Sequence, residues 1–216
     1  MIHRHLALGA AALLAVAVAA GCATTPSPQE LDAQASAAIR ASFRAQGIAT
    51  LDRIQQDDAQ RLCSSDRPPA DADARRIEAA ALATVRWPAD DRYLGDWKKG
   101  EALAQNGRGM TWTDASAATS ANGGNCYNCH QIDPKEVSYG TIGPSLYRYG
   151  QLRGVKDPAD PGSREVVRYT WGKLWNSKAY AACSNMPRFG DHHLLDETQL
   201  RDLMALLLDP KSPVNQ

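Results

Sequence analysis

The sequence of 216 residues has no excess of charge of either sign, because 24 Lys and Arg residues are balanced by 24 Asp and Glu residues. Proteins that bind nucleic acid usually carry a basic surplus, so this balance gives no indication of a nucleic-acid partner. After residue 22 the chain also contains no apolar run long enough for a transmembrane helix. We therefore expect contact with a membrane only through a lipid anchor at the start of the chain.

A second pair of metal-binding residues is missing as well. The chain contains one Cys-x-x-Cys pattern, Cys126-Tyr-Asn-Cys129, and no His-x-x-x-His. A structural zinc site needs four ligands, which commonly come as two such pairs. A thioredoxin-like redox site would place the same pattern after a strand, whereas the preceding residues here are Asn122-Gly-Gly-Asn125. A zinc site or a redox dithiol is therefore the weaker interpretation.

His130 directly follows the second cysteine and completes the pattern Cys-x-x-Cys-His. This pattern is typical of c-type haem attachment. Two thiols at this spacing reach the two vinyl groups of one porphyrin and form thioethers, and the adjacent imidazole can bind the iron from one face. The sequence thus predicts one covalently bound haem c, attached to Cys126 and Cys129, with His130 as an axial iron ligand.

Residues 1–22 are typical of a signal peptide. A short basic start is followed by an apolar run from Leu6 to Ala20, which is too short for a committed membrane span. The small residues directly before Cys22 favour lipoprotein processing, in which Cys22 becomes the lipidated N-terminus. Ordinary cleavage nearby, which would release a soluble protein, is the alternative. Both routes export the chain, so we expect it in the periplasm, where c-type haem is attached.

Two cysteines, Cys63 and Cys183, are left after the leader and the haem motif are accounted for. In an oxidising exported compartment two remaining thiols more often pair than stay free. We expect a disulfide that ties the N-terminal segment to the region near the end of the chain. The alternative is that one of the two is a reactive thiol or an iron ligand.

About 190 residues remain after the leader, which is enough for one domain with an extension. We expect residues 23–90 to form a linker and a helical N-terminal extension without evident chemistry. Apolar residues at helical spacing predict helices over 30–62, interrupted at Gly47, and over 73–85. Their apolar stripes are thin, which favours packing against a partner. Residues 91–216 then form the haem-binding domain.

The helical pattern continues in this second region, so the predicted fold class is all-α. Helices are expected over 96–106 and 166–180. Gly100 lies within the first of them and indicates a close approach to another helix, because a Gly in mid-helix otherwise costs about 1 kcal/mol. Trp171 and Trp175 share one side of the second helix, and we expect them to be core residues rather than a binding site.

The last helix is expected to begin with a capping-box-like pair, Asp196 and Gln199. It carries an apolar stripe that includes Met204 and ends before Asp209-Pro210. We expect it to cross the helix at 96–106. Residues 211–216 are predicted to be a free tail.

Pro144 follows His130 by fourteen positions, within Gly140-Thr-Ile-Gly-Pro-Ser-Leu146. A carbonyl placed there can contact the second imidazole nitrogen, which fixes the ring orientation and raises the basicity of the ligand. The alternative is a simple Gly-Pro turn. If the carbonyl makes this contact, Leu146 packs against the porphyrin edge, so Pro144 and Leu146 are predicted haem-pocket residues.

Met186 is the predicted sixth ligand of the iron. It lies in a Met-Pro loop, a non-helical context that can fold over the far face of the haem. A thioether in this position favours reduced iron and raises the potential relative to two His ligands. Met110 precedes the haem motif, and Met204 lies within a predicted apolar helix face, where core packing is the usual role. The remaining rival ligands are Cys183, His192 and His193.

The order His130, Pro144 and Met186, placed between N- and C-terminal helices, resembles a class I cytochrome c. Four stretches together resemble the SoxX family, the monohaem subunits of the SoxAX cytochromes of sulfur-oxidising bacteria. They are Gly124–His130, Gly140–Leu146, Cys183-Ser-Asn-Met-Pro-Arg-Phe-Gly190 and Leu206-Leu-Leu-Asp-Pro210. The resemblance covers roughly residues 90–215. Shorter members of the family lack an extension as long as 23–90, so the resemblance assigns no role to that segment.

The resemblance implies a function in electron transfer. SoxAX joins thiosulfate oxidatively to a cysteine of the carrier protein SoxYZ and releases two electrons, so the complex is an L-cysteine S-thiosulfotransferase. The catalytic haem is expected on the partner subunit SoxA. The present chain would form a heterodimer with SoxA, with a small accessory subunit as a further candidate partner, and would pass electrons to a soluble cytochrome c. It would contain no catalytic nucleophile of its own.

Two other functions remain open at this stage. The first is a free-standing periplasmic class I cytochrome c without an enzyme partner, which should display a charged docking cluster that this sequence does not show. The second is a ligand-binding or catalytic haem protein with an open sixth site. Reduced iron in such a protein would bind carbon monoxide, and Met186→Ala would change little.

Overall fold

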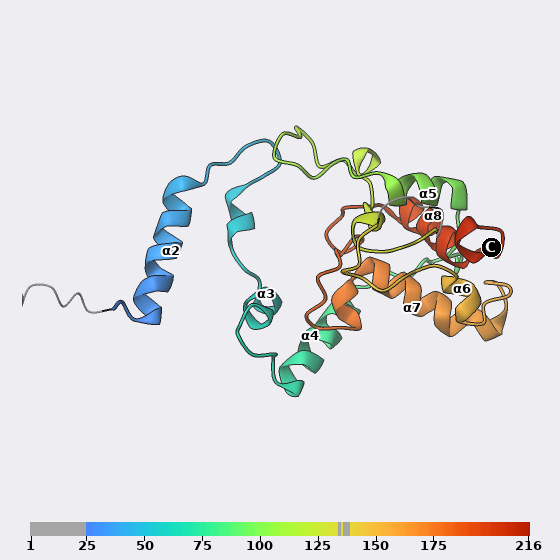
Figure 1. The fold of residues 1–216 in the computed structure, drawn as a ribbon, viewed down its shortest axis with the longest axis horizontal. Helices are drawn as coiled ribbons and strands as arrows, with labels where there is room; N and C mark the ends of the chain where they lie inside the picture. Colours follow the sequence, from blue (N-terminus) through green and yellow to red (C-terminus); the bar gives the residue numbers. More distant parts are fainter. Residues whose placement is uncertain (1–24, 134, 136–138) are drawn as a thin grey trace, which may run out of the picture. The chain divides into compact units, whose positions relative to one another are not determined.

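The computed structural model describes residues 25–133, 135 and 139–216 (Figure 1). The leader and Cys22 lie outside the described residues, so the predicted signal peptide and lipidation are not addressed by the fold. Within these ranges the secondary structure is helical without strands, apart from one isolated bridge between Gln46 and Ala49. The prediction of an all-α protein is therefore confirmed. None of the helices in the described part of the chain has the length and apolar character needed to cross a membrane.

The chain forms two compact units, Met1–Arg44 and Ala45–Gln216. In the first unit the structure describes one helix, α2 (Pro28–Ser42). A capping box between Ser27 and Glu30 begins this helix, because each side chain satisfies a backbone N–H that has no partner within the helix. No residue of α2 is buried, and its apolar side chains, such as Ile39, remain exposed.

The second unit begins with short elements, η1 (Leu51–Ile54) and α3 (Asp58–Cys63), followed by α4 (Asp71–Ala83). The helix predicted between Gly47 and residue 62 is only partly present, because Leu51–Ile54 forms a 3-10 helix and Asp58–Cys63 a short α-helix. Gly47 adopts φ +52°, a conformation that suits Gly. The next amide, of Ile48, donates to the Asp114 carbonyl at 3.0 Å. Tertiary pairing of this segment thus replaces the helix that its apolar spacing predicts.

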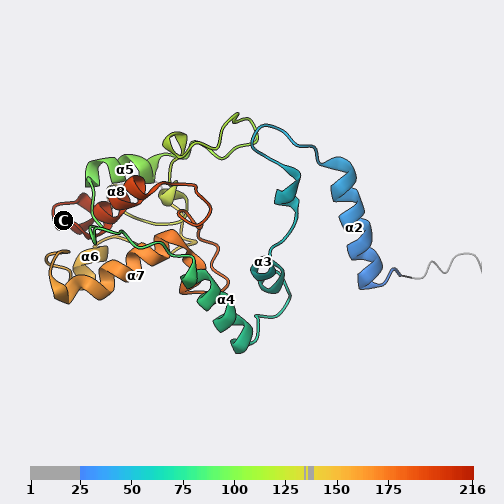
Figure 2. The same cartoon turned by 180° about the vertical axis from the view of Figure 1, so that it is seen from behind.

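Two helices that are distant in sequence lie side by side in the second unit, α5 (Trp97–Gln105) and α8 (Glu197–Leu208) (Figures 1 and 2). Gly100 of α5 lies directly on the backbone of α8, and a Cβ at this position would overlap the Asp202 carbonyl. Asp96, the N-cap of α5, donates its amide to the buried Asp202 carboxylate at 2.7 Å. The predicted reason for a mid-helix Gly, a close helix–helix approach, is confirmed.

The last helix, α8, supplies much of the core. It begins with the predicted capping box between Asp196 and Gln199 and ends before Asp209. Its buried residues extend beyond the predicted stripe and include Leu200, Asp202, Leu203, Met204, Ala205, Leu206, Leu207 and Leu208. Each buried Leu or Met contributes about 1.5–3 kcal/mol by leaving water. Met204 is fully buried, as the core assignment predicted.

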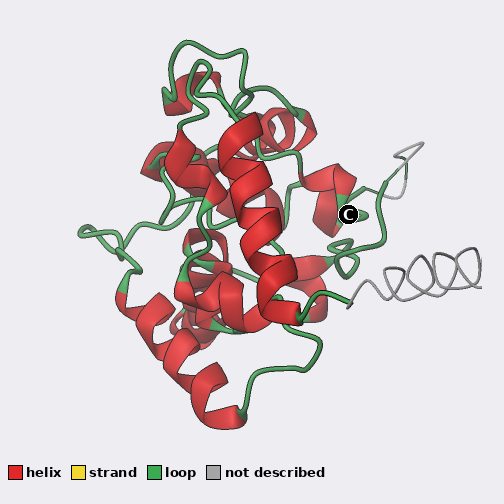
Figure 3. Ribbon diagram, turned by 90° about the vertical axis from the view of Figure 1, so that its left-hand side faces the viewer, coloured by secondary structure: helices red, strands yellow, loops and turns green. Residues whose placement is uncertain are grey.

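The other long helix of this unit is α7 (Arg164–Trp175). Its residues Trp171 and Trp175 are buried, and their rings stack with centroids 6.1 Å apart. The indole N–H of Trp171 donates to the Arg86 carbonyl at 2.8 Å. The two Trp residues are therefore core residues, as predicted. The shorter elements are η2 (Thr119–Ala121), η3 (Cys126–Asn128), α6 (Tyr149–Leu152), η4 (Pro161–Ser163), η5 (Ser177–Ala179) and η6 (Pro213–Asn215). Figure 3 shows the helices in red and the loops that connect them in green.

The C-terminal tail is docked, so the prediction of a free tail was wrong. Val214 is fully buried, and its carbonyl accepts a hydrogen bond from the Arg148 amide at 2.7 Å. The Asn215 side chain accepts from the Gly150 amide at 3.0 Å and donates to the Leu207 carbonyl at 3.0 Å. The Asn215 side chain thereby forms hydrogen bonds with a free amide at the start of α6 and a free carbonyl at the end of α8, because backbone groups at helix ends lack partners within their helices.

Candidate functional site

The Cys-x-x-Cys-His segment forms one tight turn, η3 (Cys126–Asn128). The residue before it, Asn125, has a left-handed backbone with φ +50°. The amides of Cys129 and His130 both donate to the Cys126 carbonyl, at 3.1 and 2.9 Å. Two thiols and an imidazole therefore lie within five consecutive residues of one hydrogen-bonded turn.

This turn is attached to the end of α5. The amide of Gly124 donates to the Leu103 carbonyl at 2.8 Å, and the amide of Asn125 donates to the Asn106 carbonyl at 3.0 Å. Gly123, which precedes them, lies so close to Asn106 that a Cβ would overlap its carbonyl. The carbonyls at the C-terminal end of a helix lack partners within the helix, and here the backbone directly before Cys126 donates to two carbonyls at that end.

The two thiols of the motif are not joined to each other. Desolvation raises the pKa of the Cys126 thiol to about 12. A redox dithiol depends on a lowered thiol pKa, so this environment disfavours that alternative. Within the described residues no three His, Cys, Asp or Glu side chains converge as a metal-binding group.

The imidazole of His130 is oriented by Pro144. Its Nδ1 lies 2.6 Å from the Pro144 carbonyl oxygen, the contact that the sequence predicted. A carbonyl can only accept, so the proton resides on Nδ1. This leaves the lone pair of Nε2 free to bind a metal. The ring also lies against the backbone of Gly143, where a Cβ would overlap it.

The loop that carries Pro144 is paired to the motif along its length. The amides of Gly140 and Gly143 donate to the carbonyls of Tyr127 and Cys129, at 2.8 and 2.7 Å. The amide of Leu146 donates to the Gln131 carbonyl at 2.7 Å, and its side chain packs against the hydrophobic core. The orientation of His130 is therefore set by backbone pairing within residues 126–146.

Met186 lies in the irregular segment between η5 and Phe189. It is half-buried and packs against the same hydrophobic core as Cys126 and Leu146. Its carbonyl accepts from the Ser177 hydroxyl at 2.6 Å. Its side chain therefore lies on the same core that borders Cys126, and its role as an iron ligand stays a prediction.

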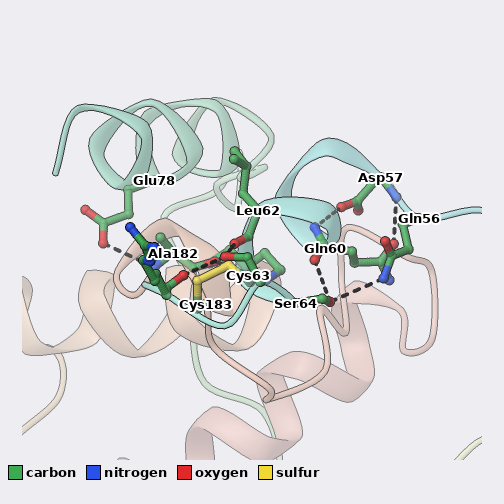
Figure 4. Close-up of a disulfide and its surroundings, with 12 residues drawn as sticks. Gln56, Asp57, Gln60, Leu62, Cys63, Ser64, Glu78, Ala182 and Cys183 are labelled. Carbon is green, nitrogen blue, oxygen red and sulfur yellow. Dashed lines mark hydrogen bonds between the residues drawn. A yellow bond between two sulfur atoms is a disulfide. The ribbon is translucent and has the colours of Figure 1, made fainter. Parts of the chain in front are cut away.

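The rival ligands differ from Met186 in their surroundings. Cys183 forms a disulfide with Cys63 (Figure 4), the pairing that the sequence predicted, so its thiol is not free. Desolvation, with the nearby Arg188 charge, lowers the pKa of His192. His193 lines a cavity of about 300 Å³ together with Trp175 and the segment after α4.

Residues of the extension also contact the Met186 segment, which the sequence did not indicate. Asp57 forms an ion pair with Arg188, with 2.9 Å between carboxylate and guanidinium. Glu78 of α4 accepts a hydrogen bond from the Ala182 amide at 3.2 Å (Figure 4). The partners are more than a hundred positions apart, so no local spacing could have revealed them. Residues 45–90 accordingly belong to the same compact unit as the Cys-x-x-Cys-His segment.

Known proteins give one informative comparison. No established protein-family profile matches the chain. The chain is 36% identical over 167 residues to an uncharacterized lipoprotein of Aquifex aeolicus (strain VF5), and the alignment covers 74% of this chain and 73% of that protein. Identity at this level over most of both sequences shows common descent, so the chain belongs to the family of this uncharacterized lipoprotein.

Proposed function

We propose that the protein is an exported monohaem c-type cytochrome that transfers electrons. Cys126 and Cys129 would hold the haem, and His130 and Met186 would be its axial ligands. The observation that carries this proposal is the 2.6 Å contact between His130 Nδ1 and the Pro144 carbonyl. It directs Nε2 outward from a turn that also presents two unpaired thiols. When bound, haem supplies a one-electron redox centre.

The residues of the chain perform three tasks in this proposal. Pro144 keeps the proton on Nδ1 of His130 and raises the basicity of Nε2. Met186 offers a thioether, which favours the reduced state of iron. The buried core that borders both ligand loops excludes water, which limits the reorganisation that accompanies a change of charge.

The more specific proposal is that the chain is the SoxX-type subunit of a SoxAX complex. The stretches around His130, Gly140–Leu146, Met186 and Asp209-Pro210 support it, because together they resemble that family. The chain would receive electrons released when SoxA couples thiosulfate to a cysteine of SoxYZ, and would pass them to a soluble cytochrome. The partner SoxA would hold the catalytic haem.

The relative supports a further part of the proposal, the location. That protein is named a lipoprotein, and the leader of this chain ends in small residues before Cys22. We assign Cys22 as the lipidated residue and place the protein in the periplasm at a membrane surface. A lipid anchor of this kind leaves the folded domain in the aqueous compartment.

Purification of the exported protein from its own host tests the proposal. A haem stain on a denaturing gel reports covalent attachment, and mass spectrometry identifies proteins that co-elute. Thiosulfate is then added with and without SoxYZ while haem reduction is followed. Co-elution of a second c-type cytochrome, with reduction only when SoxYZ is present, supports the SoxX assignment. Elution alone, without reduction by sulfur substrates, indicates a free-standing class I cytochrome c instead.

A further inference from the structure

The segment that carries Met186 is tied on both sides to one short helix, α3 (Asp58–Cys63). On the N-terminal side, Cys183 is bonded to Cys63, the last residue of α3. On the C-terminal side, Arg188 pairs with Asp57, the N-cap of α3, at 2.9 Å. Met186 therefore lies between two attachments to opposite ends of the same helix.

The Asp57 carboxylate both caps α3 and forms the ion pair with Arg188. One oxygen accepts from the Gln60 amide at 2.6 Å and begins α3, and the other accepts from Arg188 at 2.9 Å. Partial burial opposes ionisation, but the hydrogen bonds from Gln60 and Arg188 prevail and lower the pKa of Asp57. The Arg188 side chain is only 16% exposed, so its charge is directed to a defined partner rather than to bulk water.

A neighbouring contact adds to the attachment at Cys183. Ala182 donates its amide to Glu78 of α4 at 3.2 Å (Figure 4). Its carbonyl accepts from the Lys178 ammonium at 3.0 Å. The backbone directly before the disulfide is thus held by α4 as well as by the disulfide itself.

The Met186 segment has little regular structure of its own to hold it. Met186 itself has two described hydrogen bonds, from the Ser177 hydroxyl to its carbonyl at 2.6 Å and from its amide to the Ser184 hydroxyl at 3.3 Å. The amide of Ser184 donates to the Ala181 carbonyl, and the Arg188 carbonyl accepts from the His192 amide, both at 2.9 Å. Pro187 follows and has no amide to donate. The attachments to α3 therefore add a long-range constraint on each side of the thioether to these few local bonds.

We propose that α3 positions the distal iron ligand: the Cys63–Cys183 disulfide and the Asp57–Arg188 ion pair hold the Met186 segment in place. This inference rests on the proposed function, because it takes Met186 as a ligand. It gives residues 57–63 a specific role, and this role requires no contact between α3 and the haem.

The test measures how firmly the thioether stays on the iron in the purified haem-loaded protein. Three variants are compared: Asp57→Asn, the pair Cys63→Ser with Cys183→Ser, and their combination. Carbon monoxide binding to the reduced protein reports displacement of the sulfur, and the charge-transfer absorption of the ferric iron–thioether bond reports the ligand directly. The control is Asp58→Asn, because Asp58 lies on the same helix but pairs with the exposed Arg61 and Arg76.

We expect carbon monoxide to bind roughly two- to fivefold faster in Asp57→Asn, as suits loss of a partly exposed ion pair. We expect at least a tenfold increase when the disulfide is removed, because a cross-link of this kind restricts far more of the chain. The combined variant should lose the charge-transfer band, and Asp58→Asn should match the unmodified protein. Asp57→Asn keeps the disulfide and so remains informative if the cysteine variants fail to fold.

Met186→Ala separates failure of this inference from failure of the proposed function. If Met186→Ala keeps the charge-transfer band, the ligand assignment is wrong. If Met186→Ala loses the band but every α3 variant retains unmodified carbon monoxide binding, Met186 is the ligand and the positioning role of α3 is overturned.

Discussion

The two loops that carry the candidate iron ligands are held in different ways. The His130 loop is fixed from within, by backbone pairing between residues 126–131 and 140–146 and by the Pro144 carbonyl. The Met186 segment is fixed from outside, by a disulfide and an ion pair to residues 57–63. A loop of the first kind depends on its own sequence, whereas the second depends on a distant helix. We therefore expect changes in the extension to affect one ligand and spare the other.

The largest effect is expected on covalent haem attachment, and it should come from changes in the His130 loop and not from changes at Met186. Replacement of Cys126 and Cys129 by Ser removes both thiols that can form thioethers, so covalent haem should be lost entirely. A haem stain on a denaturing gel measures this. Met186→Ala is the matched change in the other loop and should retain a normal stain, and loss of stain there would contradict the division of roles between the loops.

The next effect concerns the disulfide and should appear in global stability. Replacement of Cys63 and Cys183 by Ser should lower the free energy of unfolding by about 2–4 kcal/mol, because the unfolded chain regains the freedom that the cross-link removes. Urea titration followed by circular dichroism measures the change. The same replacement should leave covalent haem in place, since the His130 loop has its own backbone contacts.

Gly143→Ala tests the internal packing of the His130 loop. A Cβ there would overlap the imidazole ring, and we expect a loss of about 1–3 kcal/mol from overpacking, together with altered visible absorption. Gly162→Ala is the control, because the nearest atom to its added Cβ is 3.4 Å away. Equal stability of the two variants would show that the ring is not confined by Gly143.

The smallest effect is the pH dependence of the Asp57–Arg188 pair. The pKa of Asp57 is lowered from its ordinary value of 3.8, so the stability that it adds is fully present above that value and is lost as the pH falls through the lowered pKa. The Asp57 side chain is 42% exposed, and solvent screening keeps its contribution below about 1 kcal/mol. In an acid titration the stabilities of unmodified protein and Asp57→Asn should differ by a constant amount above the ordinary value of 3.8 and converge at lower pH. A difference that stays constant at lower pH would exclude this linkage.

Local features of the fold were predictable from the sequence. Three of them follow from residue types at short spacing. They are the capping box at Asp196, the apolar helix α8 that follows it, and the close approach of two helices at Gly100. The contact between His130 and Pro144 spans fourteen positions. It could still be predicted from the sequence, because the Gly-Pro turn brings the chain back to the Cys-x-x-Cys-His segment.

Features that depend on distant partners were not predictable in the same way. The segment after Gly47 has helical spacing, yet its pairing with Asp114 changes its structure. The C-terminal tail was predicted to be free, whereas the Asn215 side chain forms hydrogen bonds with backbone groups at the start of α6 and the end of α8. The Asp57–Arg188 pair joins residues 131 positions apart, and no pattern of charge along the chain specifies that pairing.

The disulfide also has a consequence for the order of maturation. Cys63 and Cys183 are separated by 120 positions, and Cys126 and Cys129 lie between them. Four thiols that enter an oxidising compartment together can pair in three ways, and only one of these contains the Cys63–Cys183 bond. If haem is attached first, as the proposed function allows, the two inner thiols are consumed and a single pairing is left. Haem attachment would then prevent wrong disulfides from forming. Cells unable to attach haem should accumulate chains with mispaired cysteines.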